Sequence, residues 1–514
     1  MSKHELAVKL LADEYWWGGR VADGRSMPFG HALHRVDLSS AHLGNQACPL
    51  LISSKGRFVW SETSFEFRFE DGWLSLQSHG DELITGEGYG TLKGVFRHVS
   101  RTFFPPAPAI PEPLLFTAPQ YNLWIELLYE PTQEKVLQYA QDVLASGMPP
   151  GVIMIDDNWH EPYGNWRFHS GRFPDPKAMV RELHRMGFKV MLWVCPFVSP
   201  DSPAFRELEP SGLLLKGSDG QTAIRQWWNG YSAVLDCTNP DTVNWLHAQL
   251  DRLQADYGID GFKLDAGDNE FYEAGDQSYA ASTPNGQCEA WARVGLKYPL
   301  NEYRACWRLA GQPLVQRLKD KSHEWSGNGL DALIPDGLAQ GLMGYAYNCP
   351  DMIGGGEFLS FTTSRLDAEL FVRYAQCSAL FPMMQFSAAP WRILDKEHLG
   401  YCVDAAKLHA RMGGEIVALA EHAARTGEPI MRHMAYEFPN EGMETVQDQF
   451  MLGSDWLVAP ALKKGMRVRE VVFPAGIWDG DDGSVVHGPT KQAVPVPLGR
   501  LPHYRKRMPQ SHME

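Results

Sequence analysis

After about residue 117, short apolar runs alternate with longer stretches in which apolar residues recur at helical spacing. The expected strands cover residues 123–127, 151–157, 189–196 and 258–267, and the expected helices cover residues 132–146, 175–186 and 241–257. This alternation is typical of parallel strands connected by helices, and a (β/α)8 barrel needs about 250 residues. An open doubly wound sheet shares the pattern, but no Gly-rich phosphate loop follows these strands, which disfavours a nucleotide fold. We therefore predict an α/β fold with a TIM barrel over residues 117–424.

The regions on either side of the expected barrel have a different pattern. Residues 1–116 alternate short apolar runs with turn residues, which predicts an N-terminal β-sandwich, and the Pro-rich run 104–113 reads as a linker. From residue 425 to 514 the β pattern returns, with expected strands at 448–454, 456–460 and 468–473. We expect a small β-sandwich there, after the barrel.

Composition excludes several classes of partner. The chain has 514 residues, and its 47 Lys and Arg against 62 Asp and Glu give a formal charge of −15. A net negative charge of this size argues against binding to nucleic acid or to an anionic membrane. The eight cysteines are scattered singly, without the spacing of a disulfide framework or a zinc site. We expect no metal and no organic cofactor.

Targeting signals are also not evident in the sequence. Residues 1–20 are polar and amphipathic and lack the apolar core of a signal peptide. No segment approaches about 18 uninterrupted apolar residues, the length that a membrane-spanning helix requires. We expect a soluble, cytoplasmic protein.

The segment Ile259–Asp268 (IDGFKLDAGD) is the strongest candidate for a catalytic strand. A short apolar strand ends in Asp265, and small residues follow it, as at the active face of a barrel enzyme. Lys263 stands two residues earlier, so both side chains leave the strand on one side. A neighbouring cation keeps a carboxylate ionised, as a nucleophile requires. A buried Lys–Asp pair that merely closes a core remains an equal reading of this segment alone.

Further polar and aromatic side chains gather where the other expected strands end. They are Asp156, Asp157, Trp193, Asp268, Arg304, Trp307, Asp320 and Asp351. Four of them have a structural alternative: Asp156 and Asp157 as N-cap or turn residues, Trp193 as core, and Asp351 as a brace in a salt bridge. Paired carboxylates with tryptophan walls are what glycoside cleavage needs, since one carboxylate attacks and the other protonates the leaving oxygen.

These residues support a family resemblance over most of the chain. The barrel motifs IDDNW, FPDPKAMVRELHRMGFKVMLWVCPFV, VLDCTNPDTVNW and DGFKLDAGD are similar to those of the retaining α-glycosidases of glycoside hydrolase family 31. Residues 49–60 and the stretch PIMRHMAYEFPNEGMETVQDQFMLGSDWLVAPAL resemble the regions before and after the family's barrel. The resemblance implies that Asp265 is the nucleophile, that Asp268 orients the site, and that Arg304 is the family's strand-five arginine.

The same resemblance implies an acid/base residue at Asp320, 16 residues after Arg304. The family's usual Trp-x-Gly-Asp reads here as Arg317-Leu318-Lys319-Asp320, so the chain departs from the pattern at this point. Asp336 is the nearest rival for the role, and Asp331 is a weaker one.

The sequence therefore predicts a retaining exo-α-glycosidase that takes an oligosaccharide or glycoside substrate. The motifs KLDAGD, LIPDGL and MMQFSAAPW resemble a branch of the family associated with α-galactosidase activity. An α-glucosidase, a transglycosylase and a carbohydrate-binding protein without turnover are the alternatives. The family's second C-terminal sandwich has no counterpart here, and the face that it would cover could support a homo-oligomer.

Overall fold

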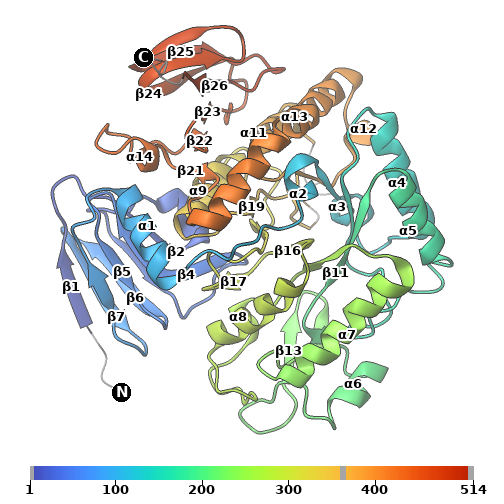
Figure 1. The fold of residues 1–514 in the computed structure, drawn as a ribbon. Coiled ribbons are helices and arrows are strands. Elements are labelled where there is room, and N and C mark those ends of the chain that lie inside the picture. The colour runs from blue at the N-terminus through green and yellow to red at the C-terminus, as the bar shows by residue number, and fades with distance from the viewer. Residues whose placement is uncertain (1–4, 359, 361–365, 508–514) are drawn as a thin grey trace.

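The computed structural model describes residues 5–358, 360 and 366–507. A barrel occupies the centre of the molecule, with the N-terminal strands (blue) on one side and the C-terminal strands (red) on another (Figure 1). Helices α4 (Gln133–Ala145), α5 (Pro176–Arg185) and α7 (Pro240–Tyr257) cover the outside of the barrel, and the long helix α13 (Lys396–Thr426) runs across it (Figure 1). The predicted fold class is confirmed.

Within the described residues, the barrel sheet has eight strands in the order β19, β18, β16, β15, β11, β10, β9, β20. Their bounds are β9 (Gln120–Asn122), β10 (Val152–Ile155), β11 (Lys189–Val194), β15 (Gly261–Leu264), β16 (Asn301–Tyr303), β18 (Gln316–Arg317), β19 (Asn348–Cys349) and β20 (Gln385–Phe386). All neighbours pair in parallel. The Ile353 N–H donates to the Gln385 carbonyl at 2.8 Å, which ties the segment after β19 to β20 and nearly closes the sheet.

The central strands form because their apolar residues are covered on both faces. Every residue of β10 (VIMI) and β15 (GFKL) is buried, as expected for a parallel sheet with side chains inside and helices outside. The register places Trp193 of β11 beside Lys263 of β15, and Lys263 beside Glu302 of β16. Polar residues of adjacent strands therefore reach the barrel interior at the same height.

Most helices of the barrel region, though not α2, α3, α9 and α12, begin at a side-chain cap. Their bounds are α2 (Leu114–Thr117), α3 (Trp124–Leu127), α4 (Gln133–Ala145), α5 (Pro176–Arg185), α6 (Pro203–Leu208), α7 (Pro240–Tyr257), α8 (Pro284–Val294), α9 (Leu333–Leu342), α11 (Ala368–Ala379), α12 (Pro390–Ile393) and α13 (Lys396–Thr426). Asp175 and Asn239 accept hydrogen bonds from the first turns of α5 and α7, and a proline follows each cap. Gly258 ends α7 with φ 82°, a left-handed conformation that favours glycine.

The prediction of a strand at residues 123–127 is wrong. The first strand is β9, and Trp124–Leu127 is the short helix α3. Gln120 and Asn122 of β9 point to a polar cluster in the barrel, where each side chain bonds the amide of Gln385 (2.5 and 3.2 Å). A search for apolar runs misses such a strand because its inward residues satisfy one another by hydrogen bonds.

The N-terminal region contains two sheets. One has the order β1 (Glu5–Lys9), β7 (Trp73–Ser78), β6 (Phe65–Glu70), β3 (His34–Asp37); the other contains β2 (Trp16–Arg20), β4 (Gln46–Ser53), β5 (Phe58–Trp60), β8 (Ile84–Gly86) and β17 (Cys306–Trp307). The strand β17 belongs to the barrel region and pairs with β4, so the two regions share a sheet.

The expectation of β structure throughout residues 1–116 is wrong for helix α1 (Leu92–Phe103). Thr91 accepts a hydrogen bond from the Gly94 N–H and starts the helix. The buried residues Leu92, Val95, Phe96 and Val99 recur at helical spacing and form its inner face. The Pro-rich run 104–113 has no helix or strand, as predicted.

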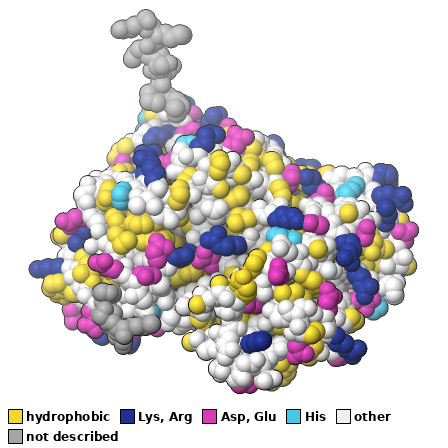
Figure 2. Space-filling model, turned by 60° about the horizontal axis from the view of Figure 1, so that its bottom comes forward, with side chains coloured by type: hydrophobic (Ala, Val, Ile, Leu, Met, Phe, Trp, Pro, Cys, Tyr) yellow, Lys and Arg dark blue, Asp and Glu magenta, His cyan; other side chains and the backbone are white. Residues whose placement is uncertain are grey.

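The C-terminal region forms a six-stranded sheet among the described residues. Its order is β21 (Met431–Arg432), β22 (Phe450–Leu452), β23 (Trp456–Val458), β26 (His503–Lys506), β24 (Val468–Gly480), β25 (Val485–Pro495). No helix in the described part of the chain is both long and apolar enough to cross a membrane. On the face shown in Figure 2, acidic and basic side chains are interspersed.

An additional three-stranded sheet lies between β11 and α7 in the sequence. It consists of β12 (Phe197–Val198), β13 (Ile224–Trp227) and β14 (Gly230–Val234), all antiparallel. The hairpin β13–β14 turns at Trp228 and Asn229. This turn lies at the same end of the barrel as the carboxyl ends of its strands, because Trp228 lines the cavity described next.

Candidate active site

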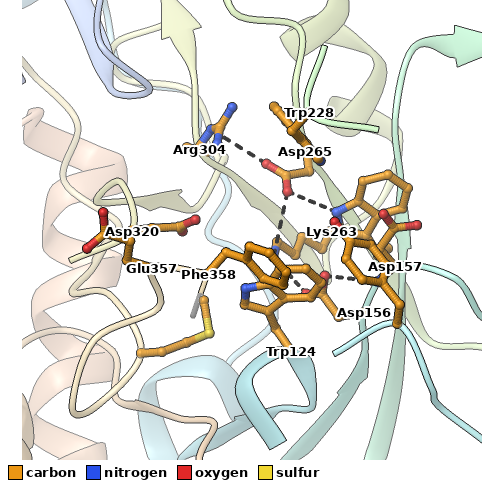
Figure 3. A pocket seen from close by; sticks show the side chains of 13 residues that line it. Trp124, Asp156, Asp157, Trp228, Lys263, Asp265, Arg304, Asp320, Glu357 and Phe358 are labelled. Atoms are coloured by element: carbon orange, nitrogen blue, oxygen red, sulfur yellow. Dashed lines mark hydrogen bonds and ion pairs between the residues drawn. The ribbon is translucent and has the colours of Figure 1, made fainter. Parts of the chain in front are cut away.

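A cavity of about 320 Å³ lies at the carboxyl ends of the barrel strands (Figure 3). It is lined by Trp124, Tyr129, Asp156, Asp157, Trp193, Trp228, Lys263, Asp265, Arg304, Asp320, Met352, Glu357 and Phe358. Seven of these residues follow from the sequence prediction: Asp156, Asp157, Trp193, Lys263, Asp265, Arg304 and Asp320. The carboxyl end of the strands is where barrel enzymes place their chemistry, which makes this cavity the candidate active site.

Asp265 lies one residue after β15 and is only 8% exposed. Its Oδ2 accepts a hydrogen bond from the Trp193 indole at 2.9 Å and lies 3.8 Å from Lys263 Nζ. Its Oδ1 lies 3.7 Å from Arg304 Nε and has no hydrogen bond within the described structure. One oxygen is thus held by the protein, and the other remains available to a bound molecule.

The surroundings of Asp265 keep it ionised. Burial alone would raise the pKa of this carboxyl, but the positive charges of Lys263 and Arg304 outweigh burial and hold its pKa well below the usual range. The indole hydrogen bond acts in the same direction. An ionised, buried carboxylate with a free oxygen is suited to attack an electrophilic carbon.

Lys263 is the cation at the centre of this group. Its Nζ lies 2.7 Å from Asp156 Oδ2, closer than to Asp265. Burial opposes its charge, but Asp156 and Asp265 together raise the pKa of Lys263 above its ordinary value. The segment therefore contains more than a simple core pair, since one lysine neutralises two carboxylates that line the cavity.

Arg304 lies one residue after β16 and contacts Asp268 and Trp228 in addition to Asp265. Its Nη2 donates to Asp268 Oδ2 at 2.7 Å, and its Cζ lies 4.8 Å from the centre of the Trp228 ring. Asp268 is 1% exposed and does not line the cavity. In this arrangement Asp268 orients Arg304 rather than reaching the cavity itself.

Asp320 lines the same cavity from the segment after β18, and its side chain is 33% exposed. Arg317 Nη1 lies 2.9 Å from Asp320 Oδ1 and 2.6 Å from Asp351 Oδ1, and its Nε lies 3.2 Å from Glu302 Oε1. Arg317, at the position of the family's tryptophan, is thus completely buried among three carboxylates.

Asp336 and Asp331 do not line the cavity. Asp336 is buried and pairs with Lys321 at 2.5 Å, and Asp331 pairs with Arg25 at 3.1 Å. Of the three aspartates considered for proton transfer, only Asp320 contributes to the cavity lining.

Two other predicted residues also lie outside the cavity lining. Asp351 is fully buried and accepts hydrogen bonds from the backbone N–H groups of Lys321 (2.6 Å) and Gly356 (2.8 Å). Burial raises the pKa of Asp351 to about 6, despite the opposing charge of Arg317. Trp307 lies in β17, where its ring stacks on His42 with centroids 5.4 Å apart. The first is placed as a brace and the second as packing between barrel and N-terminal sheet.

The remaining lining residues were not predicted from the sequence. They are Trp124, Tyr129, Trp228, Met352, Glu357 and Phe358. They come from connections, from the hairpin turn and from α3, whose residues the sequence pattern had indicated as a strand. Asn229 followed by Gly230 was an available signal for a turn, and Gly230 adopts a positive φ of 98° directly after the two turn residues. No group of three or more His, Cys, Asp or Glu in the described part of the chain is arranged to hold a metal ion.

Comparison with protein families gives two matches. Residues 115–412 match the model of the "Glycosyl hydrolases family 31 TIM-barrel domain", and residues 427–507 match the "Glycosyl hydrolase family 31 C-terminal domain". The first match alone covers more than half of the chain. The chain belongs to glycosyl hydrolase family 31.

Curated family 31 relatives differ in their named activities. The chain is 32% identical to the myogenesis-regulating glycosidase of Mus musculus over 77% of this chain and 56% of that protein. It is 27% identical to the α-xylosidase XylQ of Lactiplantibacillus pentosus over 86% of this chain and 60% of that protein. The chain therefore spans 56% to 60% of the length of these two relatives.

Solved family 31 structures share the fold. A sulfoquinovosidase from E. rectale matches 99% of this chain and 83% of its own, with a TM-score of 0.85 and 18% identity. An α-xylosidase from a soil metagenome matches 99% and 80%, with a TM-score of 0.84 and 20% identity. These structures resemble the chain in the arrangement of the backbone. The sugar that the chain accepts depends on the residues that line its own cavity.

Proposed function

We propose that this chain hydrolyses terminal α-linked glycosides with retention of configuration. The observation that carries the proposal is the pairing of Asp265, buried and held ionised, with Asp320 in the lining of one cavity. A retaining glycosidase needs such a pair, since one carboxylate attacks while the other transfers the proton.

In the first step, protonated Asp320 donates its proton to the glycosidic oxygen while Asp265 attacks the anomeric carbon. The carbon–oxygen bond breaks, the aglycone leaves as an alcohol, and a β-linked glycosyl ester forms on Asp265. The attacking atom is Oδ1, because Oδ2 is held by the indole of Trp193. Arg317 has two further carboxylate partners, Glu302 and Asp351, when Asp320 is protonated.

In the second step, the Asp320 carboxylate takes a proton from water as the water oxygen attacks the anomeric carbon. The ester bond to Asp265 breaks, and the sugar leaves with its α configuration restored. If a second sugar replaces water, the same two carboxylates perform transglycosylation.

We favour a terminal α-galactoside as substrate, with an α-glucoside as the runner-up, on the motif resemblance described above. The cavity volume lies near the lower end of ligand sites, which span about 300–1,000 Å³, and this favours a terminal sugar over an internal chain segment. The lining contains five carboxylates, from Asp156, Asp157, Asp265, Asp320 and Glu357. Lys263 and Arg304 are already paired with carboxylates, so a neutral sugar fits this charge balance better than an anionic one.

The test is hydrolysis of a panel of p-nitrophenyl α- and β-glycosides by the wild type, Asp265→Asn and Asp331→Asn. We expect release from one neutral α-sugar, loss of about 10⁴-fold or more in Asp265→Asn, and little change in Asp331→Asn. The second variant makes the same chemical change at an ion pair outside the cavity. Sugar binding without turnover, indifferent to Asp265→Asn, would instead identify a carbohydrate-binding protein.

A further inference from the structure

The two aspartates that follow β10 have different surroundings. Asp156 pairs with Lys263, as described above. Asp157 Oδ1 accepts the Asn158 N–H at 2.6 Å, and its Oδ2 accepts the Asn229 side-chain amide at 2.6 Å. The Tyr163 hydroxyl lies 3.2 and 3.1 Å from the two oxygens. The protein itself therefore occupies both oxygens of Asp157, which is 2% exposed.

Tyr163 acts as a donor in this group. Burial, followed by the charge of Asp157, raises the pKa of Tyr163 far above its ordinary value, so the hydroxyl keeps its proton. The ring packs against Trp227 of β13 at 4.8 Å between centroids. Tyr163 thus supports the hairpin and the carboxylate at the same time.

Asn229 forms the other half of the contact, at the turn of the β13–β14 hairpin. Its Nδ2 donates to Asp157 Oδ2 and also to the Tyr163 hydroxyl at 2.8 Å, and its Oδ1 accepts from the Tyr129 hydroxyl at 2.8 Å. All hydrogen-bonding ability of this amide is directed at residues of the barrel. The Asn229 side chain therefore holds the tip of the hairpin against Asp157 and Tyr129, which line the cavity.

Trp228 is the immediate neighbour of Asn229 and is 44% exposed. It lines the cavity and covers Arg304, whose Cζ lies 4.8 Å from the ring centre. Consecutive Cα atoms are about 3.8 Å apart, so fixing Asn229 restrains the backbone of Trp228. The Trp228 ring itself packs against Trp227 and Phe271, with centroids 5.1 and 5.8 Å apart. Figure 3 shows Trp228 beside Arg304 and Asp265, with Asp320 and Glu357 on the opposite side of the view from Asp157.

We propose that Asp157 is a positioning residue that anchors the hairpin tip, so that Trp228 forms one side of the substrate cavity. In this role it does not accept a sugar hydroxyl, although the sequence pattern placed it among the substrate-binding residues. The kinetic test of this proposal rests on the proposed function, because Trp228 is expected to contribute to the affinity for the glycoside substrate.

A double-mutant cycle of Asp157→Asn and Trp228→Ala separates anchoring from direct binding. If Asp157 acts through Trp228, each single variant raises KM about tenfold with kcat changed less than about threefold, and the double variant is no worse than Trp228→Ala. If Asp157 binds the sugar directly, the two losses multiply to about 100-fold, and the proposal is overturned.

The exchange of the two side chains gives a rescue test. In Asp157→Asn one acceptor oxygen becomes an NH2 donor, so the side chain can no longer accept from both the Asn158 N–H and the Asn229 amide. Adding Asn229→Asp gives the new donor an acceptor and restores the pair. We expect this double variant to recover KM to within about threefold of wild type. A sugar ligand at position 157 would not be rescued, since the carboxylate has moved to the hairpin.

Hydrogen exchange of the hairpin amides (residues 224–234) tests the anchor without catalysis. We expect faster exchange in Asp157→Asn and in Asn229→Ala, and wild-type exchange in Gln226→Ala, an exposed position on the same hairpin. Asn229→Ala alters only a turn side chain, so it keeps the test open if Asp157→Asn fails to fold. Unchanged exchange in Asn229→Ala overturns the proposal. A wild type that cleaves no glycoside would defeat the proposed function and leave this measurement valid.

Discussion

Two groups of residues line the cavity, and they differ in origin, burial and chemistry. The strand wall lies in or just after β10, β11, β15, β16 and β18: Asp156, Asp157, Trp193, Lys263, Asp265, Arg304 and Asp320. The rim comes from α3, the connections and the hairpin: Trp124, Tyr129, Trp228, Met352, Glu357 and Phe358.

The strand wall is connected by charge. Lys263 and Asp156 are less than 5% exposed. Lys263 forms ion pairs with Asp156 and Asp265, and the Trp193 indole donates a hydrogen bond to Asp265. The rim is mainly aromatic and more open, with Trp228 44% and Phe358 46% exposed. The Phe358 ring lies 5.8 Å from those of both Trp124 and Tyr129. The difference indicates that the barrel strands supply the reaction, whereas the connections shape what can bind.

If the strand wall depends on its central cation, Lys263→Met should have the largest effect on stability. It leaves Asp156 and Asp265 buried without their shared partner, which we expect to cost about 3–5 kcal/mol in unfolding free energy. Urea unfolding measures the loss. Lys297→Met is the matched control, since its ion pair with Asp251 is 41% and 46% exposed and should contribute less than about 1 kcal/mol. Equal losses in the two variants would contradict the comparison.

Replacing Asp320 should separate proton transfer from attack. With an alkyl or sugar leaving group, Asp320→Ala should lower kcat/KM by about 10²–10⁴-fold, because the leaving oxygen needs a proton. With p-nitrophenol, a weakly basic leaving group, the loss in the first step should be much smaller. Parallel assays of both substrate types, with Asp331→Ala as the control, test this. An equal loss on both substrates would remove Asp320 from the acid role.

The charge of Arg304 should be visible in the pH profile. Because the folded-state pKa of Asp265 is depressed, its contribution to stability is present above its unfolded value of about 3.9 and is lost as pH falls. Arg304→Gln removes a cation that lowers the pKa of Asp265. It should therefore shift the acid limb of the kcat/KM profile to higher pH by about one unit. Arg308→Gln, at a residue that pairs with Glu62 and Glu289, should leave that limb in place. An unmoved limb in both variants would contradict the role of Arg304.

The smallest effect is expected at the rim. Tyr129→Phe removes the hydroxyl that donates to Asn229 and keeps the ring. One neutral hydrogen bond contributes about 0.5–1.5 kcal/mol, so KM should rise about threefold while kcat stays near wild type. Tyr231→Phe, on the exposed side of the same hairpin, should change neither constant. A loss in kcat as large as that of a strand-wall variant would break the distinction between the groups.

Part of the barrel was predictable because strands β10, β11 and β15 are largely apolar and most of its helices carry side-chain caps. The expected ranges at β10, β11 and β15 contain the observed strands. The first strand was not predictable in this way, since the side chains of Gln120 and Asn122 bond Gln385, which is 263 residues or more away along the chain. A residue whose partner is so distant in sequence leaves no local pattern.

The residues of the candidate site divide in the same way, into those with a local sequence signal and those whose contacts are distant along the chain. The Lys263–Asp265 spacing on one strand indicated a charged pair, and the structure adds Asp156 as the closer partner of that lysine. Sequence spacing could not assign different roles to Asp156 and Asp157. The partner of Asp157 is Asn229 of the hairpin, and this contact exists only in the folded structure. Trp307 and Asp351 also follow strands, yet one packs on His42 and the other is enclosed by backbone donors.

The sequence by itself determined the barrel, the strand that carries Asp265 and the family to which the chain belongs. These depend on periodicity and on short motifs, in which the interacting residues are near one another along the chain. Only the tertiary structure decided which aspartates line the cavity, how Arg317 is shared among three carboxylates, and which aromatic residues form the rim. Those outcomes depend on contacts between separate connections, and such contacts exist only after the barrel has brought the strand ends together.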